Sequence, residues 1–210
     1  MWPFWLSWPS PWYIRFCRNS RGPAQKLKLS VPGDKPPGMN IFYLSKKTSR
    51  CARWHCDKHV VKMILETAQL LYTAHWVLDV TPDFSSAPCR LSGEAGYMPI
   101  RNVKHPSALW ARSGLLQYMW LCDLGMALCA EFRHRFSGRA HACEEHIFWL
   151  YAHPPAAIPR IPWTQPPQAM PPEVRRADSV VAYREYYRKN KAHLLTFTGR
   201  ARPHWLSGGA

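Results

Sequence analysis

The fold of this chain is decided by residues 52–75, which read ARWHCDKHVVKMILETAQLLYTAH. The stretch predicts one long helix with a narrow polar stripe, whose members are His55, His59, Lys62, Glu66, Gln69 and Thr73. Their spacings of 4, 3, 4, 3 and 4 place them within about 40° of one line along a helix. The flanks are nearly all apolar, so packing is expected to enclose the stripe. Burying imidazoles, an ammonium and a carboxylate together is costly unless they satisfy one another or line a cleft, and the stripe therefore indicates a functional site.

Two other interpretations of the stripe stay open. It can be an ordinary hydrophilic face on which His55 and His59 are surface histidines. It can also hold a metal, because His55 and His59 stand at i and i+4 as in zinc-binding helices, with Cys51 and Cys56 nearby. A third ligand is missing, and no second cluster of Cys and His lies at a useful spacing. We expect neither a metal nor a cofactor.

The composition favours one basic domain with a polyanionic partner. The 210 residues are 47% hydrophobic, which suffices for a single domain with a substantial core. The formal net charge is +15, which favours nucleic acid before a membrane. Seven cysteines, an odd number without a CxxC pair, favour free thiols in a reducing compartment, so we expect a cytoplasmic protein. No nucleotide-binding Gly-rich loop or nucleophile elbow is present.

Residues 1–38 differ from the rest of the chain. They are crowded with Trp and Pro, show no sustained period and end in PGDKPPG. Their apolar start is too short to span a membrane and lacks the features of a secretion signal. We expect a disordered or artefactual extension, with translation starting at Met39, where MNIFYLS predicts a short strand.

The remaining pattern predicts an all-α, compact single domain over residues 39–210, with long irregular connections. Residues 79–106 form an irregular connection rich in Pro and Gly. Helices are expected over 107–136, 141–152 and 178–195, separated by a proline-rich traverse at 153–173 that is pinned to the surface by its apolar residues. The second helix is expected to bury Leu109, Leu116, Trp120, Leu124, Ala127 and Leu128.

Basic and aromatic residues alternate near the end of the chain, as in a nucleic-acid surface where cations bind phosphates and rings stack on bases. The residues concerned are Tyr183, Tyr187, Arg188, Lys191, Arg200 and Arg202. The alternative is that the tyrosines are core and the charges a solvated face.

Several motifs carry a resemblance over residues 39–205. MNIFYL, HCDKHVVKMILETAQLL, KHPSALWAR, PPQAMP and AYREYY resemble a family of small proteins of phages and large DNA viruses. The order of elements is more distantly similar to the pyrimidine-dimer DNA glycosylases of the T-even phage type. That resemblance implies a compact all-α enzyme that excises a damaged pyrimidine, with Glu66 as the glutamate that stabilises the ribosyl cation. It also implies an N-terminal α-amine as nucleophile, which requires a chain that starts at Met39 or Asn40; otherwise water, Lys58 or Lys62 takes that part.

The stripe suits this chemistry, because breaking an N-glycosidic bond needs a carboxylate, a proton donor and cations for the backbone phosphates. The catalytic residues are expected to be Glu66, His55 or His59, and Lys62, and Lys58 is expected to bind phosphate. His105 and Arg112 are expected to complete the pocket. Trp54, Trp110 or Tyr97 is expected to serve as the wedge that extrudes the nucleotide.

We therefore expect a DNA glycosylase that acts on double-stranded DNA at a modified or damaged pyrimidine. Glucosylated 5-hydroxymethylcytosine of phage DNA is one target, with an antiphage role, and a pyrimidine dimer in repair is the other. A non-enzymatic DNA-binding protein of the same fold and, more distantly, a metal-dependent phosphohydrolase remain the alternatives.

Overall fold

The computed structural model describes residues 39–206, and the expectations for residues 1–38 lie outside this range. The described part is all-α, as predicted, with no strand assigned in it. Its α-helices are α1 (Thr48–Trp54), α2 (Asp57–Leu78), α3 (Pro106–Ala111), α4 (Leu115–Arg135), α5 (Glu144–Ala152) and α6 (Ser179–Asn190), joined by the short 3₁₀ helices Pro172–Val174, Ala192–Leu194 and His204–Leu206. None of these helices is long and apolar enough to cross a membrane.

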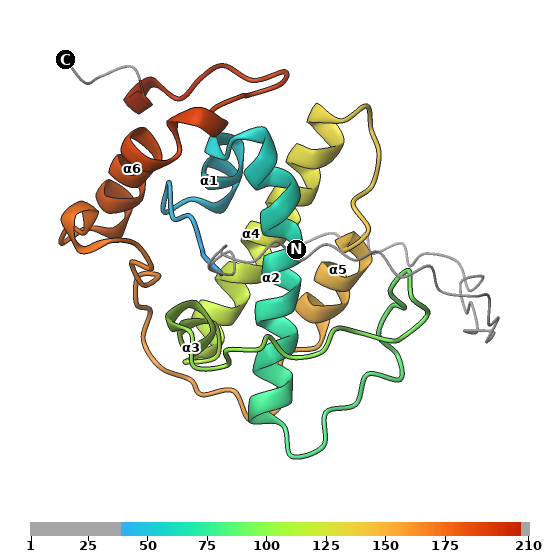
Figure 1. Ribbon diagram of the computed structural model, residues 1–210. Helices are drawn as coiled ribbons and strands as arrows, with labels where there is room; N and C mark the ends of the chain where they lie inside the picture. The colour runs from blue at the N-terminus through green and yellow to red at the C-terminus, as the bar shows by residue number, and fades with distance from the viewer. Residues whose placement is uncertain (1–38, 207–210) are drawn as a thin grey trace, which may run out of the picture. The chain divides into compact units, whose positions relative to one another are not determined.

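The core is built around α2, which passes through the middle of the bundle with α4 and α5 packed along it (Figure 1). Ile64 and Leu71 on α2 and Leu128 on α4 are fully buried. The helices approach closely at Gly125 of α4, because a Cβ atom placed there would lie 3.0 Å from side-chain carbons of Thr67 on α2 and Ile147 on α5. This packing encloses most of α2, as its apolar flanks predict.

The predicted strand at the start of the domain is wrong. Residues 41–44 are buried, each at most 4% exposed, but no neighbouring backbone in the described part of the chain forms a ladder with them. A buried apolar run satisfies the pattern of a strand, yet a strand also needs a paired partner. In this segment, side-chain donors bond individual carbonyls instead of a neighbouring strand. Arg184 of α6 donates to Leu44 O over 3.0 Å, and Trp120 of α4 donates to Lys46 O over 3.1 Å.

The long helix predicted over residues 52–75 is two helices. The backbone is extended at His55 (ψ 138°) and Cys56 (ψ 160°), so α1 ends at Trp54 and α2 begins at Asp57. Arg135 of α4 donates to the carbonyls of Arg53 and His55, each over 2.8 Å. These distant bonds satisfy backbone groups that a continuous helix would have paired internally.

The helix predicted over residues 107–136 is also divided. Gly114 is extended, with ψ 161°, and Leu115 N donates to Pro159 O in the proline-rich traverse over 2.8 Å. The break changes the faces of both halves, so Leu109 and Leu116, expected in the core, are 48% and 53% exposed. Leu124 and Leu128 are buried as expected. The last helix is shorter than predicted, because α6 ends at Asn190.

The proline-rich traverse is pinned to the domain, as predicted. Gln117 Nε2 donates to Pro162 O over 2.9 Å, and Trp110 Nε1 donates to Thr164 O over 3.1 Å. Met170 near its end is only 6% exposed. The expectation of free thiols is confirmed for five buried cysteines, namely Cys51, Cys56, Cys122, Cys129 and Cys143.

Candidate functional site

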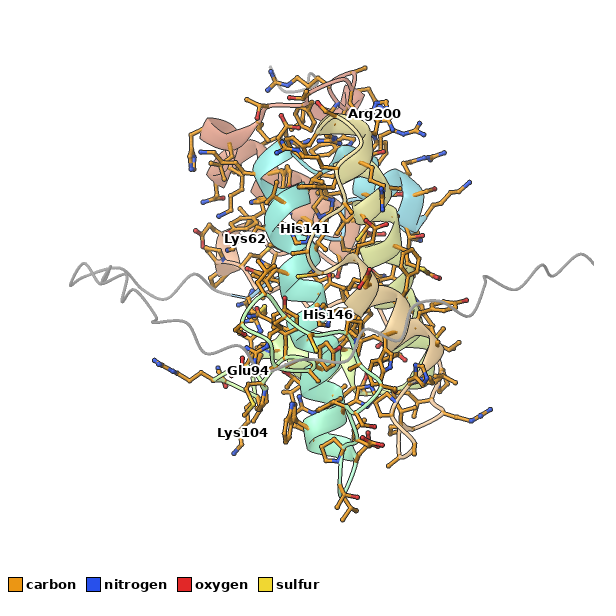
Figure 2. The ribbon with its side chains drawn as sticks, turned by 90° about the vertical axis from the view of Figure 1, so that its right-hand side faces the viewer. Lys62, Glu94, Lys104, His141, His146 and Arg200 are labelled. Carbon is orange, nitrogen blue, oxygen red and sulfur yellow. The ribbon has the colours of Figure 1, made fainter. Side chains whose placement is uncertain are left out.

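The stripe on α2 is largely enclosed, with Glu66 at its centre. His59, Glu66 and Thr73 are each at most 6% exposed. The Lys62 side chain is 44% exposed, and Figure 2 shows it beside α2, with Arg200 near the upper end of the bundle. Lys62 is therefore the point at which the stripe meets solvent.

The Glu66 carboxylate has two partners. Its Oε2 accepts from the backbone N–H of Asn40 over 3.1 Å, and its Oε1 lies 2.9 Å from Lys62 Nζ. Burial raises the pKa of the Glu66 carboxyl above its ordinary value, although Lys62 and Asn40 act in the opposite direction. A carboxylate in this setting is less solvated than a surface carboxylate and interacts more strongly with a nearby cation.

Asn40 is fixed in front of Glu66 by its own side chain. Its Oδ1 accepts from Ile41 N over 2.8 Å, and its Nδ2 donates to Ala169 O over 3.1 Å. The Tyr183 hydroxyl shares its hydrogen between Asn40 Oδ1, at 2.7 Å, and Pro167 O, at 2.6 Å. The extended segment, α6 and the turn at 166–171 thus hold the Asn40 nitrogen at the carboxylate.

His59 is packed rather than free. Its ring stacks on Phe42 with a centroid distance of 4.2 Å and an interplanar angle of 16°, and its Nδ1 shares a short hydrogen bond with the Tyr187 hydroxyl. Burial, followed by the charges of His55, Lys191 and Lys62, lowers the pKa of His59 to about 3. The imidazole is therefore neutral at pH 7, which suits it poorly to donate a proton.

His55 lies outside α2, which corrects its predicted place on the helical stripe. It is fully buried, and its Nδ1 donates to Cys51 O over 2.8 Å. Its Nε2 is buried without a hydrogen-bond partner among residues 39–206. Burial lowers the pKa of His55 to about 4. These contacts favour a structural histidine at the junction of α1 and α2 over a proton donor.

A buried arginine ties this junction to α4. The Arg135 side chain has no exposed surface. Besides the carbonyls of Arg53 and His55, it donates to Asp57 Oδ1 and to Glu131 Oε2, each over 3.1 Å. Asp57 also accepts from the backbone and hydroxyl of Thr198, so its carboxylate joins the start of α2 to the C-terminal segment. Sequence reasoning missed Arg135 because nothing in the run Arg133–His134–Arg135 distinguishes the buried member.

The structure corrects three of the predicted DNA contacts. Tyr183 and Tyr187 are fully buried and Trp110 is 6% exposed, so none of these rings offers a face to a base. The alternative that the tyrosines are core is thus the correct one. Trp54 is half-buried beneath Arg184, whose Cζ lies 4.8 Å from the ring centroid.

The predicted cations lie in several places. Lys58 and Arg202 are exposed, Arg188 donates to Trp205 O over 3.1 Å, and Lys191 Nζ lies 5.0 Å from the Tyr186 ring centroid. Arg200 is paired with Glu131, with a shortest distance of 2.8 Å.

His105 and Arg112 flank α3. His105 Nδ1 accepts from Ser107 N over 3.2 Å and caps the helix, and burial lowers the pKa of its imidazole. Arg112 follows the last residue of α3, and its Nη1 is buried without a hydrogen-bond partner in the described part of the chain. Within residues 39–206, no hydrogen bond or ion pair connects either residue with Glu66.

Two surface hollows lie away from the stripe. One, of about 610 Å³, is lined by the proline-rich turn and the start of α6, including Gln168, Arg175 and Ser179. The other, of about 510 Å³, lies at the C-terminal end of α2 beside His75, Asp79 and Trp149. Glu66 lines neither of these two hollows, and its Oε1 is paired with the partly exposed Lys62 side chain.

The described residues contain no group of three or more His, Cys, Asp or Glu side chains that could hold a metal ion. The sequence suggested His55 and His59 as metal ligands. Their Nδ1 atoms instead form hydrogen bonds with Cys51 O and Tyr187 Oη, respectively. Comparison with known proteins adds no identification, because no family model, no curated protein and no solved structure matches the chain.

Proposed function

We propose that this protein is a DNA N-glycosylase that removes a modified or damaged pyrimidine from double-stranded DNA and leaves an abasic site. The observation that carries the proposal is the buried Glu66 carboxylate, held 3.1 Å from the Asn40 backbone nitrogen and 2.9 Å from Lys62 Nζ. The resemblance to the pyrimidine-dimer glycosylases assigns the catalytic carboxylate to the same residue. The net charge of +15 suits a polyanionic substrate.

Lys62 controls the exposure of the carboxylate. Its ammonium occupies Glu66 Oε1, but the side chain is flexible and 44% exposed. A DNA phosphate that attracts Lys62 would draw the ammonium off the carboxylate and leave Oε1 free to face a sugar. Binding of the DNA backbone and exposure of the Glu66 carboxylate would then occur together.

Glu66 would stabilise the positive charge that develops on the sugar as the bond from C1′ to the base breaks. The bond's electron pair leaves with the base, which takes a proton from water. A second water attacks C1′ and gives its proton to Glu66, which passes it to the hydroxide left by the first water. The products are then the free base, an abasic sugar and an ionised Glu66. Neither His59 nor His55 is assigned a proton in this scheme, because both imidazoles are neutral at pH 7.

The Asn40 nitrogen decides whether strand cleavage accompanies excision. In the continuous chain it is a peptide nitrogen, whose lone pair is delocalised into the carbonyl and does not act as a nucleophile. If the chain began at Asn40, the same nitrogen would be an α-amine beside Glu66 and could attack C1′ as the bond from C1′ to the base breaks. Opening of the bond from C1′ to the ring oxygen, with loss of the amine protons, one of them to that oxygen, would then give a Schiff base with DNA. The continuous chain is therefore proposed to hydrolyse, without a lyase step.

The proposed target is a bulky modified pyrimidine such as glucosylated 5-hydroxymethylcytosine in phage DNA, which gives the protein an antiphage role in the cytoplasm. A pyrimidine dimer is the second target consistent with the resemblance. The test incubates the full chain with T-even phage DNA, ultraviolet-irradiated DNA and unmodified DNA, and then cleaves abasic sites with alkali.

The matched variants are Glu66→Gln and, as a control, Glu145→Gln on α5, where the side chain is exposed. The proposal expects alkali-dependent breaks in one of the two modified DNAs, a loss of at least about 100-fold in Glu66→Gln and no loss in Glu145→Gln. Absence of breaks in all three DNAs would overturn it. Tight DNA binding without excision would instead favour a non-enzymatic DNA-binding protein.

A further inference from the structure

Two arginines lie over the Trp54 ring, and a third bonds the backbone of the adjacent Trp205. Figure 1 shows the elements that carry them, α1, α6 and the C-terminal segment, at one end of the bundle. We call Arg50 of α1 and Arg184 and Arg188 of α6 the arginine cluster. Arg50 Cζ lies 5.8 Å from the Trp54 ring centroid, and Arg188 Nη1 donates to Trp205 O over 3.1 Å. Trp54 and Trp205 pack edge to face, with a centroid distance of 5.9 Å. Side chains from three segments thus form one surface.

Arg184 is held rigidly in the middle of this surface. Its Nε donates to Leu44 O over 3.0 Å. Its Cζ lies 4.8 Å from the Trp54 ring centroid and 5.6 Å from the Trp205 ring centroid. The planar guanidinium is therefore oriented before any ligand arrives, which reduces the entropy lost when its remaining donors bind an anion.

The cluster has no ion-paired acid. Among the described residues, no carboxylate forms an ion pair with Arg50, Arg184 or Arg188, whereas Arg135, Arg176 and Arg200 each have at least one. Burial is the largest effect and lowers the pKa of Arg184, the charge of Asp178 raises it, and the charges of Arg50 and Arg188 lower it by smaller amounts. Cations held together without a counter-ion repel one another, and an anion bound between them removes that cost.

We propose that the arginine cluster binds phosphates of the DNA backbone that flank the excised nucleotide. This inference rests on the proposed function. Guanidinium groups match phosphate oxygens with paired donors, and three of them together favour a multiply charged backbone over a single carboxylate. The role of Trp54 changes accordingly: it supports Arg184 and is not a wedge that enters the base stack.

The position of the cluster explains why it serves the flanking DNA. Trp54 ends α1 three residues before α2 begins, and Glu66 is nine residues past the first residue of α2, about 14 Å along the axis of that helix. The cluster therefore lies near the start of α2, and Glu66 lies further along it. The cluster would therefore hold the duplex while the target nucleotide is extruded near Lys62 and Glu66.

The test measures the salt dependence of binding to an unmodified duplex, so that no excision is needed. The variants are Arg50→Gln, Arg188→Gln and the double variant, with Arg160→Gln as the control because Arg160 is exposed in the proline-rich traverse and forms no ion pair within residues 39–206. Each lost phosphate contact is expected to reduce the slope of log affinity against log salt by about 0.9. We expect a reduction of about 0.9 for each single variant and about 1.8 for the double variant, with no change for Arg160→Gln.

Equal slopes for the wild type and the double variant would overturn the inference, as would a wild-type protein that does not bind the duplex. Thermal melts of the wild type and the four variants establish that the comparison is between folded chains. A lack of excision together with the expected slopes would refute the glycosylase proposal but leave the phosphate site intact. Excision with unchanged slopes would refute the phosphate site alone.

Discussion

Replacing Arg135 with methionine should cause a large loss of stability. The guanidinium is fully buried and donates to the carbonyls of Arg53 and His55 and to the carboxylates of Asp57 and Glu131. Methionine fills similar space but donates nothing, so the two carbonyls lose this partner in the interior.

The expected decrease in the free energy of unfolding depends on the hydrogen bonds that each former partner of Arg135 retains in the variant. Asp57 retains its bonds to Thr198 and Glu131 retains its pairing with Arg200, so neither carboxylate is left alone. Breaking a buried ion pair from one side costs about 3 to 5 kcal/mol, and the remaining partners offset part of the penalty that the carbonyls add. We therefore expect a decrease of about 3 to 5 kcal/mol in the free energy of unfolding.

The control lies two residues earlier on the same helix. Arg133 pairs with Glu144 over 2.9 Å, its own side chain is 48% exposed and that of Glu144 is 10% exposed. Arg133→Met leaves one carboxylate without this partner and no backbone carbonyl of a helix junction, so it should cost less than Arg135→Met. Urea unfolding of the wild type and both variants at pH 7 gives the comparison. If Arg135→Met lies within about 1 kcal/mol of the wild type, the junction of α1 and α2 does not depend on this arginine and the account of the helix break is wrong.

Three further changes test other parts of the structure. Because burial raises the pKa of Glu66, the folded chain binds a proton there more readily than the unfolded chain, and ionisation of Glu66 at pH 7 destabilises the fold. Glu66→Gln should therefore raise the urea midpoint at pH 7. The difference in midpoint between variant and wild type should shrink as the pH falls toward 4, because Glu66 of the wild type becomes protonated. A constant advantage at both pH values would contradict this assignment. Tyr183→Phe removes the hydroxyl that bonds Asn40 Oδ1 and Pro167 O, and we expect a loss of about 1 kcal/mol in urea unfolding; an unchanged midpoint would show that Asn40 is held without it. A chain that begins at Met39 should unfold at the same urea midpoint as the full chain, since residues 1–38 show no sustained hydrophobic period; failure to fold would place the domain boundary earlier.

The helical class was predictable because the hydrophobic period extends over many residues. The apolar flanks of α2 and the run Leu121, Leu124 and Leu128 on α4 repeat at helical spacing. The structure buries most of these side chains, although Val61 and Leu65 are 40% and 36% exposed. Such a signal is summed over several turns, so a single irregular position does not change it. The same period also passed through residues 55 and 56 without interruption, which is why one helix was predicted where there are two.

The breaks and buried tyrosines depend on partners that are distant in sequence. The break before α2 is satisfied by Arg135, and the break before α4 by Pro159 O. Tyr183 reads as a surface residue beside Arg184, but its hydroxyl finds acceptors in Asn40 and Pro167. A tyrosine can be fully buried when its hydroxyl is bonded, and no local pattern indicates where those acceptors will lie.

The contact between Asn40 and Glu66 joins the two observations that the sequence presented separately. One was a glutamate central to a buried stripe, and the other was an apolar segment beginning at Met39. In the fold, the first backbone N–H of that segment after Met39 satisfies the carboxylate, and Asn40 is itself anchored through its side chain. Ionised Glu66 is nevertheless destabilising, since burial raises its pKa despite both partners. A glutamine could accept the same backbone bond without that cost, so the architecture of the fold gives no reason for a charge at this position. The charge is explained if the site must stabilise a cation, and the developing charge on a deoxyribose is the cation that the proposed reaction supplies.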